Sequence, residues 1–191
     1  MEVMEQLDDL VLRHITSFLD PEDIVRLGRT SRRMYSLMPR VILTTELWKG
    51  NDFHMSGPWE PELYFDGPLL PSTVQELNMD VVWQDQGHGN RKGELYMILM
   101  RPAVEGEPVQ IAEYRRLFGI AEHYEEQANK VIPADHPVVA EAKPGDFYRF
   151  MRNAGGGGGH ELTVKNFRVE ASTRTVMYKG ASELYGESLE F

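Results

Sequence analysis

The spacing of apolar residues changes near residue 74, and this change constrains the fold more than any other feature of the sequence. Across residues 7–38, apolar side chains recur every three or four positions, which predicts short helices with one apolar face. Beyond residue 74, Leu77, Met79 and Val81 alternate with polar side chains, which predicts a half-buried β-strand. The sequence therefore predicts an α+β multidomain protein, with a small helical module followed by a sheet domain.

Three short helices are expected within residues 4–48. Asp20 and Pro21 mark the start of the second helix, because aspartate caps a helix N-terminus and proline fits the first turn. This helix is expected to stop near Gly28, and the third helix to end before Pro39.

Residues 49–72 are predicted to form a tether that packs along a domain surface, because prolines interrupt helices and central strands. Leu47 and Trp48, immediately before the tether, are expected in a helix. The prolines of this segment are Pro58, Pro61, Pro68 and Pro71.

Residues 73–179 are predicted to form an antiparallel β-sandwich or jelly roll, because short strand patterns follow one another without long helices between them. A phase slip between residues 162–164 and 167–171 predicts a bulge or bend near Asn166. Residues 180–191 are expected to be a loosely held tail. Besides residues 77–83, the strand candidates are 95–100, 109–118, 138–142, 147–151, 162–164, 167–171 and 173–178.

Charge and composition exclude several classes of function. The formal net charge is −10, and residues 51–191 hold 22 acidic and 13 basic side chains, which argues against binding to nucleic acid or anionic membranes. The chain has no cysteine, so disulfides, thiolate zinc sites and thiol nucleophiles are excluded. No apolar run approaches a membrane span, and the acidic N-terminus is unlike a secretory signal, so a cytoplasmic or nuclear location is expected.

Residues 7–37 read LDDLVLRHITSFLDPEDIVRLGRTSRRMYSL. This segment resembles the F-box family, with Asp8 where the family usually has proline and Leu10 where an acidic residue is common. The matching positions are Leu7, Ile15, Ser17, Phe18, Leu19, Pro21, Asp23, Ile24, Leu27, Thr30, Ser31 and Arg32.

This resemblance implies a partner, the Skp-type adaptor of a cullin-RING ubiquitin ligase. The contact would place an apolar helical face in a groove of the adaptor, although some apolar residues must hold the three helices together. Alternatively, the helices are a structural cap whose apolar face packs on the sandwich. The candidate partner-binding residues are Leu7, Ile15, Phe18, Leu19, Pro21, Ile24 and Leu27.

The sheet domain is similar in general plan to a galactose-binding-like or F-box-associated sandwich. Its loop Asp85–Gly93 is rich in glycine and polar residues, and we interpret it either as a long hairpin turn or as the rim of a binding site. Trp83, next to this loop, is expected in the core. The candidate ligand-binding residues are Asp85, Gln86, His88, Asn90, Arg91 and His160.

A second loop contains five consecutive glycines, Gly155–Gly159, followed by His160. It lacks the Gly-Lys-Ser/Thr ending of a nucleotide-binding loop and precedes a predicted strand, so a flexible connection is expected. His88 and His160 are predicted to meet at one end of the sandwich.

These observations predict a non-catalytic subunit that binds the ligase through its helices and a protein or glycoprotein target through the sandwich, while other subunits transfer ubiquitin. The alternative is a lectin-like module that binds carbohydrate or a small ligand without ligase association. A third possibility is a hydrolase that uses His88 or His160. Neither a serine nucleophile elbow nor an HExxH motif is present, and no cofactor or metal is expected.

Overall fold

The computed structural model describes residues 7–57, 60–156 and 159–177. They belong to two compact units. The first, called here the helical unit, comprises Met1–Thr44 and Arg174–Phe191, and the second, the sandwich unit, comprises Thr45–Thr173. The predicted tail, residues 180–191, lies outside the described residues, as do residues 178–179 of the predicted sandwich.

The helical unit contains the three predicted helices, each with a polar N-cap. The helices are α2 (Asp9–Thr16), α3 (Pro21–Gly28) and α4 (Arg32–Leu37). Asp20 accepts hydrogen bonds from the backbone N–H groups of Glu22 and Asp23, both at 2.9 Å. Asp8 caps α2 and Ser31 caps α4 in the same way. Pro21 begins α3, as predicted.

The described residues of the helical unit form a small buried core. Four of its described hydrophobic side chains are buried together, Leu12, Ile24, Met34 and Met38. Half-buried leucines surround them, namely Leu7, Leu19, Leu27 and Leu37.

Residues far apart in sequence meet in this unit. The guanidinium group of Arg174, near the end of the last strand, lies 3.4 Å from a carboxylate oxygen of Glu22 in α3. Both residues are partly exposed, so this pair contributes little to stability.

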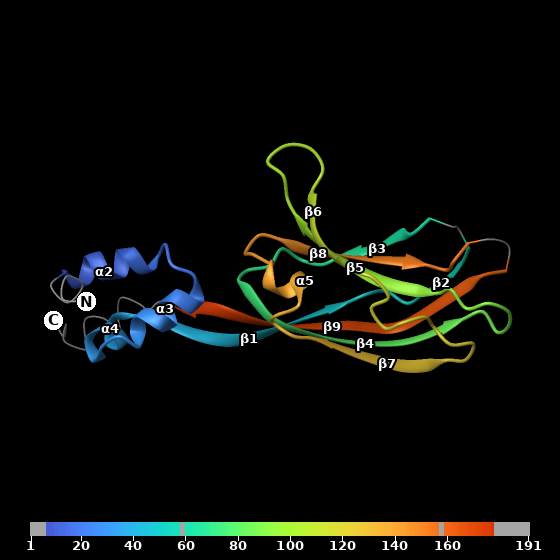
Figure 1. Cartoon of the computed structure of the whole chain (residues 1–191), viewed down its shortest axis with the longest axis horizontal. Helices are drawn as coiled ribbons and strands as arrows, with labels where there is room; N and C mark the ends of the chain where they lie inside the picture. The colour runs from blue at the N-terminus through green and yellow to red at the C-terminus, as the bar shows by residue number, and fades with distance from the viewer. Residues whose placement is uncertain (1–6, 58–59, 157–158, 178–191) are drawn as a thin grey trace, which may run out of the picture. The chain divides into compact units, whose positions relative to one another are not determined.

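Two antiparallel sheets form the sandwich (Figure 1). The five-stranded sheet has the order β1 (Arg40–Lys49), β9 (Glu161–Met177), β4 (Thr73–Asp85) and β7 (Glu126–Ile132), and β2 (Phe53–Ser56) also pairs with β9. The four-stranded sheet has the order β3 (Glu62–Asp66), β8 (Phe147–Asn153), β5 (Glu94–Arg101) and β6 (Val109–Tyr114). A short helix, α5 (Pro137–Ala140), completes the described elements. The predicted fold class is therefore confirmed.

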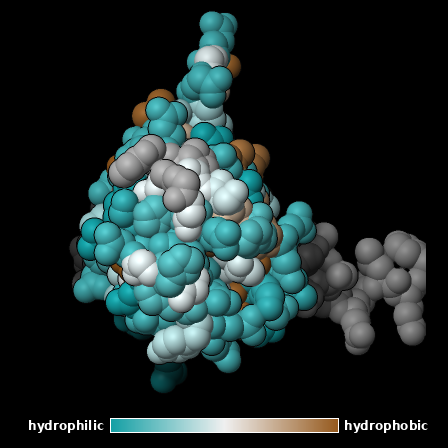
Figure 2. Space-filling view, turned by 90° about the vertical axis from the view of Figure 1, so that its right-hand side faces the viewer, coloured by the Kyte–Doolittle hydropathy of each residue, from teal (hydrophilic) through white to brown (hydrophobic). Residues whose placement is uncertain are grey.

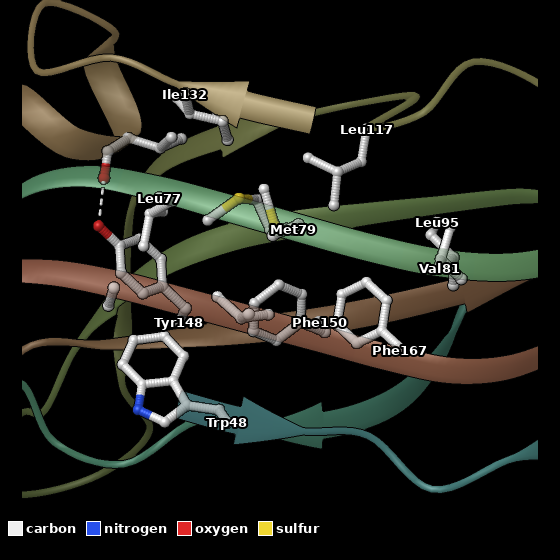
Figure 3. Packing of buried hydrophobic residues seen from close by; sticks show 14 of the residues in the cluster. Trp48, Leu77, Met79, Val81, Leu95, Leu117, Ile132, Tyr148, Phe150 and Phe167 are labelled. Carbon is white, nitrogen blue, oxygen red and sulfur yellow. Dashed lines mark hydrogen bonds between the residues drawn. The ribbon is translucent and has the colours of Figure 1, made fainter. Parts of the chain in front are cut away.

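Apolar side chains from both sheets fill the space between them (Figure 3). The ring of Phe150 stacks on Phe65, with centroids 4.7 Å apart, and meets Phe167 at 5.3 Å. Tyr148 is buried and its hydroxyl donates a 2.8 Å hydrogen bond to the Val138 carbonyl. Trp83 also lies in this core, as predicted.

The prediction of a tether over residues 49–72 is wrong. The segment contributes β2 and β3, which pair with β9 and β8 respectively. The strands are short enough to fit between the prolines, and Pro61, Pro68 and Pro71 all stand outside β3.

The predicted helix at Leu47 and Trp48 is also wrong, because both residues lie in β1. Leu47 is 52% exposed and Trp48 is 7% exposed, and such alternation between neighbours is typical of a strand. The boundary between the two units falls after Thr44, within β1, rather than at residues 48 or 73.

Two predicted strands need correction. Residues 138–142 were predicted as a strand, but Val138 and Val139 belong to α5, where the His136 side chain caps the helix. Pro137 at the first helical position favours this start. The strand predicted over residues 109–118 ends as β6 at Tyr114.

The bulge predicted near Asn166 is confirmed. Asn166 has a positive φ of 53°, an uncommon conformation that asparagine tolerates better than most residues. Val164 and Phe167 are both buried, with two exposed residues between them, so the alternation changes phase at this point.

Candidate functional site

The helical unit exposes large apolar side chains on its surface. Leu10, Phe18 and Tyr35 are 72%, 77% and 79% exposed, and Val11 is nearly half exposed. Leu10, Val11 and Phe18 come from α2 and the turn after it, and the Phe18 ring meets the His14 ring edge-on at 5.1 Å. An apolar surface on such a small unit is suited to contact with another protein.

The predicted partner-binding residues divide into three groups by burial. Ile24 and Pro21 are buried within the helical unit, so their side chains hold the helices together. Phe18 is exposed and available for a partner. The half-buried residues are Leu7, Ile15, Leu19 and Leu27.

Sequence reasoning missed Leu12, which is fully buried at the centre of the unit. The three-and-four spacing predicts an apolar face made of Leu7, Leu10 or Val11, Ile15, and Phe18 or Leu19, whereas Leu12 and Thr16 are the buried residues of α2. Because Leu10 and Val11 sit beside Leu12, both faces of α2 carry apolar residues, and periodicity alone does not distinguish the inner face from the outer one.

The start of α2 is fixed by a contact from α4. One guanidinium nitrogen of Arg33 donates hydrogen bonds to the Leu7 carbonyl at 2.6 Å and to the Asp9 carboxylate at 2.7 Å. Arg33 thus orients the helix that carries Leu10 and Val11 and leads into the turn with Phe18.

A polar cluster lies at one end of the sandwich, where β4 ends and β9 begins. Asp85, the last residue of β4, is 3% exposed. Its carboxylate accepts hydrogen bonds from the backbone N–H groups of Gln86, Lys92 and Gly93, at 2.6–2.7 Å. Asp85 therefore holds both ends of the loop together, which is the reason for its burial.

Gln86 connects this loop to two other segments. Its side-chain amide donates a 2.6 Å hydrogen bond to the Asn90 carbonyl, and its side-chain oxygen accepts one from the Glu161 N–H at 3.1 Å. The same oxygen lies 3.0 Å from His160 Nδ1, and the Gln86 backbone oxygen lies 2.5 Å from His123 Nδ1. Both oxygens are acceptors, so Nδ1 of each histidine carries the hydrogen in these contacts.

The remaining predicted ligand-binding residues lie on the rim of this cluster. His88 and Asn90 are exposed, and Arg91 forms an ion pair with Glu122. His160 contacts Gln86, whereas no contact joins His88 to His160 within the described residues. The structure thus brings the two predicted loops together, with Asp85 and Gln86 as their support.

Glu122 and His123 belong to the same cluster and were not among the predicted ligand-binding residues. They precede β7, a strand that the sequence did not reveal because most of its side chains are polar or exposed.

Figure 2 shows the end of the sandwich that carries these loops, and its visible surface is predominantly hydrophilic. In the part of the chain that the structure describes, no three His, Cys, Asp or Glu side chains are grouped to hold a metal ion.

The N-terminal region matches a known family. The F-box-like family model matches residues 9–53. The F-box-like segment covers α2, α3, α4 and β1 and ends at the first residue of β2, while the rest of the sandwich lies beyond it. A comparison with curated proteins finds no match.

Solved structures resemble the fold at low sequence identity. A structure of infectious bursal disease virus, Gx strain, is 13% identical with a TM-score of 0.50, and the match covers 73% of this chain and 34% of that one. A subviral particle of the same virus is 10% identical with a TM-score of 0.41, covering 69% and 32%. An endo-1,4-β-D-xylanase of Clostridium thermocellum complexed with xylohexaose is 10% identical with a TM-score of 0.34, covering 74% and 28%.

These likenesses concern architecture only. The chain spans about a third of the length of the first two structures. The first match supports the sandwich fold, and the two with lower TM-scores carry no argument about fold or ligand. No helix among residues 7–57, 60–156 and 159–177 is long and apolar enough to cross a membrane.

Proposed function

We propose that this protein is a substrate-recognition adaptor of a cullin-RING ubiquitin ligase. The F-box-like helices bind the Skp-type adaptor, and the sandwich binds a target protein or glycoprotein. In this proposal, ubiquitin transfer is the task of other subunits of such a ligase. We place the protein in the cytoplasm or nucleus, where such a ligase acts.

The observation that carries the proposal is the exposed apolar surface within the F-box-like segment. Leu10, Val11 and Phe18 leave large apolar areas in water, which is unfavourable unless another surface covers them. A helix that places such residues in a partner's groove gains affinity from their burial. Tyr35 in α4 adds an amphipathic side chain of the kind enriched at protein interfaces.

The sandwich supports the second half of the proposal. Its core comes from both sheets, and Asp85 and Gln86 hold the loops at one end in fixed positions. A rigid scaffold with polar loops at one end is a common arrangement for recognition of another molecule. We assign the target contact to the exposed residues of these loops, His88 and Asn90, with Arg91 and His160 beside them.

Co-purification of the full chain with a purified Skp-type adaptor tests the first half. The wild-type chain should retain the adaptor at micromolar concentration. Phe18→Ser and Leu10→Ser should each weaken binding by about tenfold or more, since burial of a large apolar side chain contributes about 1.5–3 kcal/mol. The matched control is Leu69→Ser, which alters an exposed leucine of the sandwich and should leave adaptor binding unchanged.

Ile24→Asp is a different kind of variant, because Ile24 is buried in the core of the helical unit. It should abolish adaptor binding by unfolding the helices, while the sandwich stays folded. Absence of adaptor binding by the wild-type chain would contradict the proposal, and a lectin-like function would then be the alternative to test. Equal effects of Phe18→Ser and Leu69→Ser would place the adaptor contact elsewhere.

A further inference from the structure

An open groove of about 520 Å³ lies on the outer face of the five-stranded sheet. It crosses β1, β9, β4 and β7, which are neighbours in that order (Figure 1). We call it the outer groove, and its lining residues are Lys49, Gly50, Asp52, Val82, Gln127, Asn166, Phe167 and Arg168.

The strand alternation explains which side chains enter the outer groove. Trp48 is buried in the core, so its neighbour Lys49 faces outward. The same argument places Val82 outside, next to the buried Trp83. Val82 and Gln127 are paired across β4 and β7, so the floor of the groove continues from one strand to the next.

The bulge at Asn166 directs Arg168 to the same face. If the alternation of Leu162 and Val164 had continued without interruption, position 168 would point into the core. The bulge moves Phe167 into the core and leaves Arg168 exposed. Asp52 stabilises this conformation, because its carboxylate accepts a 2.9 Å hydrogen bond from the Asn166 N–H.

The turn after β1 closes the other side of the groove. The Gly50 N–H donates a 3.1 Å hydrogen bond to the Phe167 carbonyl, which connects this turn to β9. A Cβ atom at position 50 would collide with the rings of Tyr64 and Phe65, so glycine is required there. The backbone around the groove is thus fixed from both sides.

The charges in the groove are not balanced by contacts within the described structure. Lys49 and Arg168 have no hydrogen bond or ion pair through their side chains to any described residue. By contrast, Lys165, which lies in β9 like Arg168, forms an ion pair and a hydrogen bond with the Glu125 carboxylate. The hydrogen bond raises the pKa of Lys165. The one acidic side chain in the groove, Asp52, already accepts the hydrogen bond from Asn166.

The two cations of the outer groove stand out because the rest of the sandwich unit is acidic. Residues 45–173 contain 20 acidic and 12 basic side chains, a net charge of 12 − 20 = −8. The overall field of the unit repels anions, so two unpaired cations that face the same groove form a local exception. Lysine, arginine and a side-chain amide are the groups that bind oxyanions in proteins.

We propose that the outer groove binds an oxyanion, either a phosphate or a carboxylate group, with Lys49 and Arg168 as its cationic contacts and Gln127 as an amide donor. This site is separate from the loops at the end of the sandwich and does not depend on the ligase partner. The bulge at Asn166 is then part of the binding site, because it directs Arg168 outward.

Amide chemical shifts of the full chain, titrated with inorganic phosphate or with citrate at constant ionic strength, test this proposal. We expect the largest shifts at Gly50, Gln127 and residues 166–168. Lys49→Gln and Arg168→Gln should each weaken binding of the preferred probe by about tenfold, because each removes one charge-assisted contact. Stronger binding of phosphate than of citrate assigns the site to phosphate groups, and the reverse order assigns it to carboxylates.

Two matched controls distinguish the groove from general loss of positive charge. Lys143→Gln and Arg116→Gln each remove one exposed cation outside the groove and should leave binding unchanged. Thermal unfolding of every variant should match the wild type, because all four side chains are exposed. Equal weakening in the controls, or shifts that avoid the groove with both probes, would overturn the proposal.

Discussion

The buried hydrophobic cluster of the sandwich draws on both sheets, whereas among the described residues of the helical unit it comprises Leu12, Ile24, Met34 and Met38. The helical unit also leaves Phe18 and Tyr35 in water, while Trp83, Tyr148 and Phe150 of the sandwich lie inside. Four buried side chains exclude little apolar surface from water, and units of this size usually need a partner, a metal or a neighbouring domain. By apolar burial, the described core of the sandwich is the larger source of stability, and covering the exposed apolar side chains of the helical unit would add to its buried surface.

The largest effect on stability is expected for Phe150→Ala. Phe150 is buried between Phe65 and Phe167, and its removal leaves a cavity that the stacked rings do not fill. We expect a loss of about 3–5 kcal/mol in the free energy of unfolding of the sandwich. Denaturant unfolding followed by tryptophan fluorescence measures it, and a loss below about 1 kcal/mol would mean that this core is more loosely packed than described.

Asp85→Ala should have the next largest effect. The carboxylate accepts three backbone hydrogen bonds, and its removal leaves those N–H groups without their partner near a buried site. We expect a loss of about 2–3 kcal/mol, since hydrogen bonds to charged groups contribute about 1.5–3 kcal/mol. Asp80→Ala, a change on the exposed face of β4, is the control and should have a much smaller effect. Similar losses in both variants would contradict the role of Asp85 as the residue that holds the loop.

Tyr148→Phe should have a smaller effect that depends on pH. The variant loses the hydrogen bond to Val138, which costs about 1 kcal/mol at neutral pH. Burial, with a smaller contribution from the charge of Asp146, raises the pKa of Tyr148 in the folded protein. In the unfolded chain tyrosine ionises near pH 10. The wild-type protein should therefore lose stability as the pH rises above about 10, towards the raised pKa of the folded state, because only the unfolded state releases the proton.

The variant lacks this ionisable group, so its stability should fall less steeply in that range. Unfolding in urea at pH 8, 10 and 11 measures the difference. Parallel decreases for the wild type and Tyr148→Phe would show that other groups determine the alkaline sensitivity of the sandwich.

The smallest effect on stability is expected for Tyr35→Ser. Tyr35 is exposed in α4 and lies outside the buried core of the helical unit. The stability of the unit should change by no more than about 0.5 kcal/mol, as is usual for surface substitutions. Far-UV circular dichroism during thermal unfolding measures this change. A larger loss would mean that the exposed face already contributes to folding and is not reserved for a partner.

The parts of the fold that the sequence predicted correctly are those with a local chemical signature. Asp20 and Pro21 gave the start of α3, and the phase slip gave the bulge at Asn166. The sandwich followed from the alternation in β4, which is buried on one face from Leu77 to Asp85.

The errors have physical reasons of a different kind. β2 and β3 are short and lie between prolines, so their pairing with β9 and β8 is visible only in three dimensions. β7 is an edge strand with mostly polar side chains and carries almost no apolar alternation. In α2, the burial of Leu12 depends on contacts with other helices, which the sequence of one helix does not contain.

The candidate site was predicted in part. The prediction that the loop Asp85–Gly93 lies near His160 is confirmed. The contact is made by the Gln86 side chain, whereas the prediction named His88. The burial of Asp85 and Gln86 gives them a supporting role that their polarity did not suggest. The outer groove was not predicted, because it depends on the order β1, β9, β4, β7, in which sequence neighbours are not spatial neighbours.

The pairing of β1 with β9 has a consequence for the evolution of such chains. The sandwich unit begins at Thr45 in β1 and ends at Thr173 in β9, and these strands are neighbours in one sheet. Its entry and exit therefore lie on neighbouring strands, with segments of the helical unit before and after it in the sequence. A module with this topology can be replaced as a single cassette by gene recombination while the residues of the helical unit stay the same.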